Sequence, residues 1–268
     1  MVDRSWEGLE IDSSLAHAGR MYDYMLGGTT NFEVDRTACI EANSDFPGGI
    51  EAAKAGLRAN RDFLGRAVKH MADAGIRQFL DLGTGIPSGD NTHAVALSVA
   101  PEARIVYVDN DPIVLAHAHE LLEDTPDSTA DYLYADMRNT DKILGEAART
   151  LDFGRPIGLV LVAILHFVSD DEDPYGLVAK LVDAVPSGSY LAISHLASDI
   201  MAEEMEALYS RISERTKETF VLRSRSEVER FFDGLELVEP GVALVSDWHT
   251  TSPGAVDLPV YAAVGRKP

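Results

Sequence analysis

Apolar and polar positions along the chain follow two periods that take turns from residue 78 onward. Short apolar runs predict five buried strands, and each run precedes a segment with apolar residues at helical spacing. The strands are expected at residues 78–82, 104–108, 131–135, 156–163 and 189–194. The helices are expected at residues 91–99, from 111 onward, 140–150, 174–184 and 199–217. This alternation predicts a largely parallel sheet covered by helices.

The last part of the chain breaks this alternation. Ser226 followed by Glu229 predicts a capping box that opens a short helix ending at Phe232. Two apolar stretches, 235–245 and 258–264, flank turn residues at 251–254, which predicts an antiparallel hairpin. Five strand–helix units and a hairpin predict an α/β fold with a Rossmann-like, seven-stranded sheet and a reversed edge strand, the architecture of class I methyltransferases.

Residues 1–59 lack the alternation, so we expect an N-terminal helical cap there and a Rossmann-like domain at residues 60–268. Short helices are predicted at 20–26 and 31–42, and a firmer helix from Asn60 to Ala74. The cap is rich in polar and aromatic side chains, namely Arg20, Tyr22, Asp23, Tyr24, Asn31, Phe32, Asp35 and Arg36. Two interpretations stay open: helices that pack on the main domain with internal ion pairs, or a lid that closes over a ligand and excludes water.

A glycine turn, Gly83-Thr84-Gly85, follows the first predicted strand and precedes a helix. Turns at this point of an open α/β sheet bind nucleotide-like ligands, and glycine lets a ligand approach the backbone closely. The dinucleotide fingerprint needs a third glycine where this chain has Ser88, and Gly89 comes one place late. The turn therefore favours a nucleoside ligand without a pyrophosphate, of which S-adenosylmethionine is the commonest, although a plain tight turn would look similar.

Acidic residues follow the next two predicted strands. Asp109 ends the second strand, where a carboxylate can accept hydrogen bonds from both hydroxyls of a ribose. Asp136 follows the third strand; in this fold such an acid takes the adenine amino group, and the backbone N–H of Met137 reaches a ring nitrogen. Together with the glycine turn, these strand ends predict a cofactor site. The end of the fourth strand, residues 161–167, would lie beside the methionyl part of the ligand.

Other candidate groups are less specific. His166 is a candidate general base, because histidine titrates near neutral pH, but a lone histidine is often a hydrogen-bonded core residue. The acidic loop 170–173 could bind a divalent ion; the alternative that we favour is a solvated loop whose Asp173 caps the next helix. His117 and His119 are two residues apart on a predicted helix and so face different ways, which argues against a zinc pair. We predict no metal site.

Composition narrows the range of partners. The chain of 268 residues carries 23 basic and 44 acidic side chains, a net charge of −21, and such a surface repels nucleic acid. Cys39 is the single cysteine, so no intramolecular disulfide can form. The sequence has no apolar run long enough to span a membrane and no signal-peptide pattern, so we expect a cytoplasmic protein without a membrane partner.

Several motifs resemble the actinobacterial S-adenosyl methyltransferase family, once known as a domain of unknown function. The matching segments are residues 20–28, 31–36, 58–61, 79–87, 106–112 and 161–168, and the resemblance extends from about residue 11 over nearly the whole chain. The N-terminal segment and the Gly-Thr-Gly-Ile-Pro turn are fairly specific to this family; the remainder is generic to class I methyltransferases. The resemblance implies a seven-stranded Rossmann-like fold and a bound S-adenosyl ligand, and it implies no particular substrate.

The sequence thus predicts an S-adenosylmethionine-dependent methyltransferase that acts on a small molecule, as a monomer or homodimer. The expected cofactor contacts are Tyr22, Arg58, Asp81, Gly83, Thr84, Gly85, Asp109, Asn110, Asp136, Met137, Ala163 and His166. His166 and Tyr22 are the catalytic candidates, and Asp23 is a further possible base. We expect the acceptor between residues 11–59 and the region 199–232. Two rivals stay open: a non-catalytic module that binds the cofactor, and a nicotinamide-dependent oxidoreductase.

Overall fold

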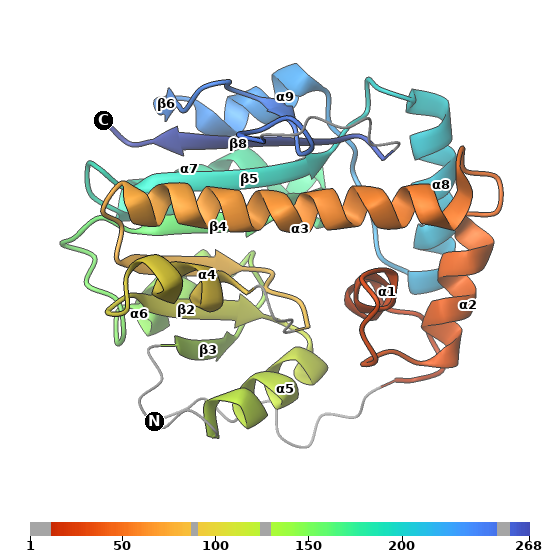
Figure 1. Cartoon of the computed structure of the whole chain (residues 1–268), viewed down its shortest axis with the longest axis horizontal. Helices are drawn as coiled ribbons and strands as arrows, with labels where there is room; N and C mark the ends of the chain where they lie inside the picture. The colour runs from red at the N-terminus through yellow and green to blue at the C-terminus, as the bar shows by residue number, and fades with distance from the viewer. Residues whose placement is uncertain (1–11, 87–90, 124–129, 251–257) are drawn as a thin grey trace.

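The computed structural model describes residues 12–86, 91–123, 130–250 and 258–268. Within these ranges an eight-stranded sheet forms the centre, in the order β3-β2-β1-β4-β5-β8-β6, with β7 also paired to β8 (Figure 1). The strands are β1 (Gln78–Leu82), β2 (Arg104–Asp109), β3 (Ala130–Tyr134), β4 (Gly158–Val162), β5 (Tyr190–Leu196), β6 (Glu236–Leu237), β7 (Ala243–Leu244) and β8 (Val260–Arg266).

Strands β1 to β5 are parallel, and β8 runs antiparallel to β5, so the predicted parallel sheet with a reversed strand is confirmed. The single strand predicted at 235–245 is wrong. It consists of two short strands, β6 and β7, which pair with different parts of β8. Pro240 and Gly241 lie between them, and proline has no N–H to donate to a ladder, which explains the interruption. The predicted turn at 251–254 lies outside the described residues.

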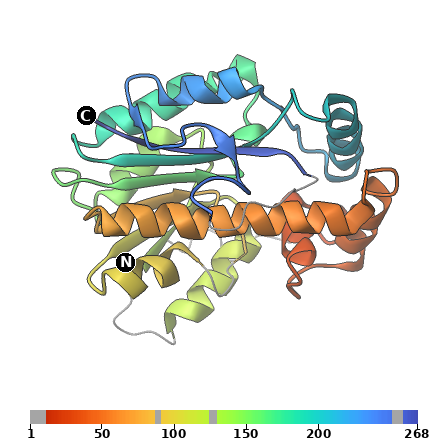
Figure 2. The ribbon, with the colours of Figure 1, turned by 45° about the horizontal axis from the view of Figure 1, so that its top comes forward.

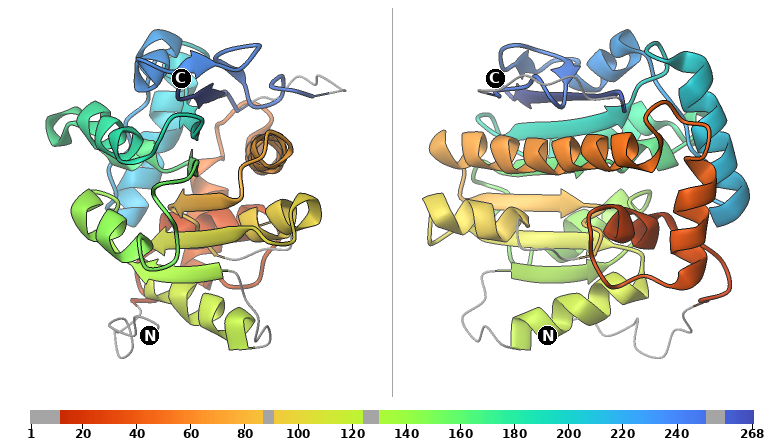
Figure 3. Two further views of the ribbon diagram at one scale, coloured as in Figure 1. Left: turned by 90° about the vertical axis from the view of Figure 1, so that its left-hand side faces the viewer. Right: turned by 45° about the vertical axis from the view of Figure 1, so that its right-hand side comes forward.

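Helices cover both faces of the sheet, which Figure 3 shows end-on. One apolar core joins α3 and α4 to one face, and the other joins α6, α7 and α9 to the opposite face. The helices are α1 (Ala18–Met25), α2 (Glu33–Ala42), α3 (Gly49–Asp73), α4 (Thr92–Val99), α5 (Pro112–Glu123), α6 (Thr140–Ala147), α7 (Pro174–Ala184), α8 (Ala202–Thr216) and α9 (Arg225–Glu229), with single 3₁₀ turns η1 (Leu165–Phe167), η2 (Asp170–Glu172) and η3 (Arg230–Phe232). No helix in the described ranges is long and apolar enough to cross a membrane.

Two predicted helix starts are wrong. Helix α3 begins at Gly49 and not at Asn60, so it runs through the boundary predicted between residues 59 and 60. Its first part buries only small residues such as Ala52 and Ala53, which leave no periodic pattern of large apolar side chains. The short helix α9 is capped by Ser224 with Glu227, two residues before the predicted Ser226; the Glu227 carboxylate accepts a hydrogen bond of 2.7 Å from the Ser224 N–H.

Helices α1, α2 and the first part of α3, which we call the cap, lie with α8 at the carboxyl ends of the parallel strands (Figures 1 and 2). A small apolar core of its own holds the cap together. The buried Arg20 side chain donates to Asp35 at 2.9 Å, and the same carboxylate accepts from the N–H groups of His17 and Phe32. The internal ion pair expected for the cap is therefore present and ties α1 to α2.

Candidate functional site

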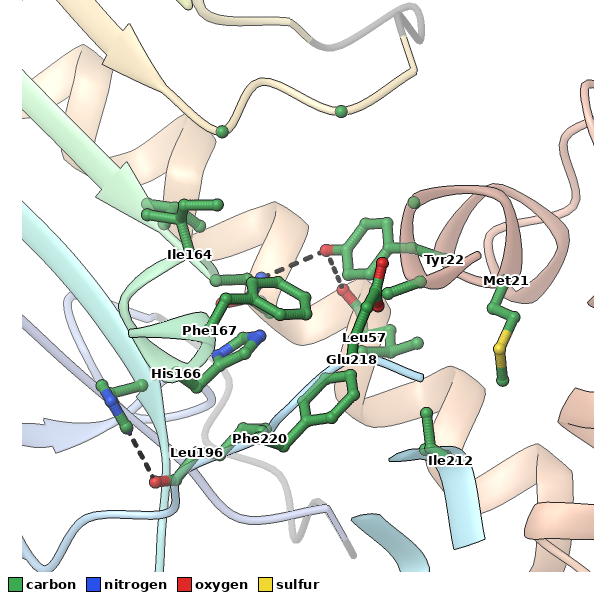
Figure 4. Close-up of a pocket in the computed structure, with 18 of the residues that line it drawn as sticks. Met21, Tyr22, Leu57, Ile164, His166, Phe167, Leu196, Ile212, Glu218 and Phe220 are labelled. Atoms are coloured by element: carbon green, nitrogen blue, oxygen red, sulfur yellow. Dashed lines mark hydrogen bonds between the residues drawn. The ribbon is translucent and has the colours of Figure 1, made fainter. Parts of the chain in front are cut away.

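A cavity of about 630 Å³ lies between the strand ends and the cap. Two regions make up its lining. The strand-end groove consists of Asp81, Gly83, Thr84, Gly85, Asp109, Asn110, Asp136 and Met137. The cap chamber consists of side chains from α1, α2, α3, α8 and the loop after α8, namely Met21, Tyr22, Met25, Cys39, Asn43, Ala53, Leu57, Asn60, Leu208, Tyr209, Ile212, Glu218 and Phe220. Residues 163–167, after β4, stand where the two regions meet, as Figure 4 shows for Ile164, His166 and Phe167.

The glycine turn has the backbone that its sequence predicts. Gly83 and Gly85 both have positive φ angles, of 73° and 64°. A Cβ atom on Gly83 would lie 2.5 Å from the side chain of Ile164, so only glycine fits there. A Cβ atom on Gly85 would meet no atom of the described residues within 4 Å, so among them this position leaves room for a ligand against the backbone.

Asp109 is held by the backbone around it. One carboxylate oxygen accepts the Gly85 N–H at 2.9 Å, and the other accepts the Asp111 N–H at 2.9 Å. Burial raises the pKa of Asp109, and these two hydrogen bonds oppose that rise. Each oxygen keeps further lone-pair capacity, so the fixed carboxylate can still accept two hydroxyl groups side by side.

Asp81 lies deeper in the strand-end groove. The Thr92 hydroxyl donates to its carboxylate at 2.6 Å, and burial raises the pKa of Asp81 to about 6. Asp136 is half-exposed at the other end of the groove, where Arg138 and Asn110 contact its carboxylate. The groove thus presents acceptors in a row along three neighbouring strand ends.

The chain reverses direction immediately after β4. Ala163 has a φ angle of 57°, a left-handed conformation that costs a residue with a side chain about 1–2 kcal/mol. Its N–H donates to the Ser194 hydroxyl at 2.9 Å, which stabilises the bend. The bend brings Ile164 against Gly83 and turns His166 into the cavity (Figure 4).

His166 is buried, with 6% of its surface exposed, and its Nδ1 atom has no hydrogen-bond partner within the described residues. Burial, together with the nearby His195 and Arg223, lowers the pKa of His166 well below its ordinary value. The ring lies 5.7 Å from that of Phe220 and nearly parallel to it. His166 is therefore an uncharged imidazole at neutral pH, held by ring contacts.

His195 and Arg223 form the support behind this ring, and no sequence pattern indicates either residue. Arg223 donates to His195 Nε2 at 2.8 Å, so Nδ1–H of His195 donates to the Leu196 carbonyl at 2.9 Å. Burial lowers the pKa of His195 to about 4. Arg223 also donates to the carbonyls of Leu165 and Val168, at either side of His166, so it fixes the loop that carries the imidazole.

Tyr22 and Asn60 meet at the entrance to the cap chamber. The Tyr22 hydroxyl accepts from Asn60 Nδ2 at 3.1 Å and lies 3.4 Å from the Leu57 carbonyl, to which it donates. Burial raises the pKa of Tyr22, so its hydroxyl keeps its proton at neutral pH. His17, at the start of α1, lies between Asp111 and Glu218, 3.3 and 3.4 Å from their carboxylates, and so ties the cap to the strand ends.

Two predicted residues lie outside the cavity lining. Arg58 points to solvent from α3, and Arg61, one turn further along the helix, lines the cavity in its place. Asp23 accepts a hydrogen bond of 2.7 Å from Asn31 and is absent from the described lining. The other eleven predicted cofactor contacts all border the cavity, and the catalytic candidates His166 and Tyr22 are among them.

Three side chains of the acidic loop 170–173 have partners within the protein. Asp170 pairs with Arg223 at 2.6 Å, and Glu172 pairs with Arg138 at 2.6 Å. Asp173 caps α7 by accepting the Gly176 N–H at 3.0 Å, so the capping interpretation is confirmed. The histidine pair considered above lies on α5, where the side chain of His119 falls outside the described residues.

Comparison with known proteins decides the family. The family described as S-adenosyl methyltransferase matches residues 4–268. The chain belongs to this S-adenosyl methyltransferase family. The methyltransferase is similar to a solved protein of the DUF574 family from Streptomyces avermitilis, with 44% identity, a TM-score of 0.90 and coverage of 97% of this chain and 100% of the other. It is also similar to a putative methyltransferase from Thermobifida fusca, with 38% identity, a TM-score of 0.88 and coverage of 98% and 99%.

A more distant likeness shows the fold alone. The 1,6-didemethyltoxoflavin-N1-methyltransferase of Burkholderia thailandensis, solved with S-adenosylhomocysteine, has 15% identity, a TM-score of 0.51 and coverage of 78% of each chain. Among curated proteins there is no match. The methyltransferase uses S-adenosylmethionine, as its family does. The groove fits that cofactor, because a nucleoside needs the room that the described residues leave at Gly85 and the acceptor atoms of Asp109.

Proposed function

We propose that this methyltransferase methylates a small molecule held in the cap chamber, with His166 accepting a proton from the acceptor. When bound, S-adenosylmethionine would supply a methyl group from its sulfonium: a lone pair of the acceptor forms a bond to the methyl carbon, the bond from that carbon to sulfur breaks in line, and S-adenosylhomocysteine leaves. The protein's task is then to align the two reactants and exclude water, and such alignment can contribute about 7–11 kcal/mol. The chain provides a groove for one reactant and a chamber for the other, with His166 at their junction.

In this proposal the strand-end groove holds the cofactor. Asp109 receives the ribose hydroxyls, and Asp136 with the N–H of Met137 receives the adenine. Gly85 allows the close approach, Gly83 forms the turn against Ile164, and Thr84 and Asn110 flank the cofactor. Asp81 and Ala163 lie toward the methionyl end. The support is that all of these residues border one cavity along consecutive strand ends.

The observation that carries the proposal is the state of His166. Its imidazole is buried and uncharged, and Nδ1 has no partner among the described residues. An uncharged imidazole can accept the proton that a hydroxyl or an uncharged amine loses as its oxygen or nitrogen lone pair bonds to the methyl group. Tyr22, whose hydroxyl keeps its proton, would orient the acceptor from the cap side.

A small acceptor suits the shape and charge of the site. The chamber lies beneath the cap and is lined largely by apolar and aromatic side chains, as sites for small molecules are. The net charge of −21 repels a phosphate backbone, which argues against nucleic acid as the acceptor. We propose that the cap shields the reacting atoms from water, the second of the two interpretations given for it.

The test compares His166→Gln with the wild-type protein. Release of S-adenosylhomocysteine would be measured with a panel of phenols, alcohols and amines, and cofactor affinity by calorimetry. Loss of a general base lowers kcat by about 10²–10⁴-fold, while the dissociation constant of S-adenosylhomocysteine should change little. His70→Gln is the matched control, because His70 packs against Tyr190 and Trp248 away from the cavity. Equal turnover by His166→Gln and the wild type would exclude proton transfer by this residue.

A further inference from the structure

The cap chamber extends into the interior of the cap. Four residues that line it, Met25, Cys39, Asn43 and Ala53, are each less than 5% exposed. They come from three helices, α1, α2 and α3, and Leu208 and Tyr209 of α8 close the remaining side. The chamber is therefore an interior part of the same cavity that reaches His166.

Two buried amides in this lining have an oxygen without a donor. Asn43 is 4% exposed; its Nδ2 donates to the Cys39 carbonyl at 2.8 Å, which fixes the orientation of the amide. Asn60 is 2% exposed, and its Nδ2 donates to Tyr22. Both Oδ1 atoms have no hydrogen-bond partner within the described residues, and the same is true of Glu218 Oε2. The two amide oxygens can only accept, so the chamber offers acceptors to its ligand.

Unpaired buried acceptors are unusual, because leaving one without a donor costs about 1–3 kcal/mol. An apolar residue in the place of Asn43 would avoid that cost, since the Cys39 carbonyl already accepts the backbone N–H of Asn43. The surrounding wall is apolar, with Met21, Leu57 and Ile212 toward the chamber (Figure 4). A polar oxygen in such a wall is explained if it binds a donor on the ligand.

The charges around the cavity restrict the ligand further. The two described arginines that line it are engaged: Arg61 with Asn91, and Arg138 with Asp136 and Glu172. The described lining contains six carboxylates, namely Asp81, Asp109, Asp136, Asp171, Glu172 and Glu218, and no lysine. An anionic ligand would therefore be repelled, whereas an uncharged or cationic one would be accepted.

We propose that the methyl acceptor is a largely apolar molecule, either uncharged or cationic, whose hydroxyl or N–H groups donate hydrogen bonds to Asn43 and Asn60. This inference rests on the proposed function, because it assigns the ligand in the chamber as the acceptor. It names Asn43 as a specificity-determining residue in the interior of the cap. Analogues whose hydroxyl donors are converted to ethers, and analogues that carry a carboxylate, should bind more weakly than the parent molecule.

The experiment uses the full chain saturated with S-adenosylhomocysteine and two matched pairs of probes. The pairs are 4-hexylresorcinol with its dimethyl ether, and 2-naphthol with 2-methoxynaphthalene. Within each pair the ring system and the alkyl chain are kept, and each hydroxyl donor is replaced by a methoxy group, which is larger by one methyl group and cannot donate. We expect calorimetry to show that the hydroxyl compound binds at least about tenfold more tightly, because the ether leaves the amide oxygens of the chamber without a hydrogen-bond donor. Equal affinities within both pairs, including no binding by any probe, overturn the inference.

Variants of Asn43 identify the residue responsible. In Asn43→Leu, and in Asn43→Ala as a second and smaller replacement, the preference within each pair should fall at least fivefold, while S-adenosylhomocysteine binds as before. Asn31→Leu is the matched control. Asn31 also lies in the cap, but its amide donates to Asp23 and accepts from Arg36, and it does not line the cavity. This variant should keep the preference; an unchanged preference in both Asn43 variants overturns the inference.

The two proposals fail in different ways. If the proposed function is wrong, His166→Gln leaves turnover unchanged. If this inference is wrong, protein that binds S-adenosylhomocysteine and turns over with dependence on His166 shows no preference for donor-bearing probes.

Discussion

The two regions of the cavity differ in how their polar atoms are paired. In the strand-end groove the chain's own backbone holds the key side chain, since both oxygens of Asp109 already accept an N–H group. In the cap chamber the amide oxygens of Asn43 and Asn60 accept nothing from the described residues. The groove is thus preorganised by local backbone geometry, whereas the chamber is completed only by what binds in it.

This difference has a physical reason. The groove is made where consecutive strands end at one edge of the sheet, so short segments position each of its groups. The chamber is made by four helices, and its walls meet only when the cap packs against α8. Mutations in the groove should therefore lower the stability of the fold, whereas mutations in the chamber should change which ligands it selects.

The largest effect is expected from Gly83→Ala in the groove. The new Cβ atom would lie 2.5 Å from Cδ1 and Cγ1 of Ile164 and 2.8 Å from its Cβ, and φ would stay positive. Overpacking and the left-handed conformation together should lower the free energy of unfolding by about 3–4 kcal/mol. Gly85→Ala, which meets open space, should lose about 1 kcal/mol. Urea unfolding of both variants measures the gap; equal losses would show that the contact with Ile164 is not what requires glycine.

A pH effect should come from the histidines at the junction. The pKa of His195 is about 4 when folded, below its ordinary value of 6.5, so between those values only the unfolded chain binds the proton. The free energy of unfolding should therefore fall as the pH drops from 7 to 4.5, with a contribution from His195 of about 2–3 kcal/mol.

In His195→Gln this contribution disappears, so its stability should depend less on pH than that of the wild type. The raised pKa of Asp81 acts in the opposite direction, stabilising the folded chain as the pH falls through about 6, but it is common to both proteins. Urea unfolding at the two pH values gives the difference. Parallel pH dependences would mean that His195 is not held uncharged in the folded protein.

A moderate effect is expected on cofactor affinity from Asp109→Asn. The amide that replaces one oxygen would face a backbone N–H, either that of Gly85 or that of Asp111. S-adenosylhomocysteine should bind about 10–100-fold more weakly, the loss of one or two hydrogen bonds to a charged group. Asp136→Asn, at a half-exposed position, should cost only a few-fold. Calorimetry on both variants tests the order; a larger loss for Asp136→Asn would reverse the roles proposed for the two acids.

The smallest effect is expected from Tyr22→Phe at the entrance to the chamber. Its hydroxyl accepts from Asn60 Nδ2, so its removal leaves that donor unpaired and should cost about 1 kcal/mol of stability. Cofactor affinity should stay within about threefold, because the Tyr22 hydroxyl bonds groups of α3 and none of the groove. Thermal unfolding and calorimetry on the same samples check both statements. A large loss of cofactor affinity would place Tyr22 in the groove.

The sequence predicts the groove better than the chamber, because short local segments form the groove whereas the chamber depends on how separate helices pack. Gly83, Asp109 and Asp136 are recognisable because each stands at the end of an apolar run, a local signal. His195 and Arg223 have no such signal, because each is the partner of a residue in a distant segment. Asn43 has none either, because its amide oxygen has no partner in the described chain. Arg58 was predicted as a contact because it belongs to a matching motif, but its position on α3 faces it away from the cavity.

Helix α3 connects the cap rigidly to the helical layer that covers the sheet. It spans 25 residues without a break, and near its far end Arg66 donates to the Trp248 carbonyl at 2.8 Å. One inserted residue between Leu57 and Phe63 would turn everything before it by about 100° and shift it by about 1.5 Å. Chimeras between relatives should thus exchange their acceptor preference only when the graft keeps the number of residues along this helix, because that number sets the angle between the cap and the sheet.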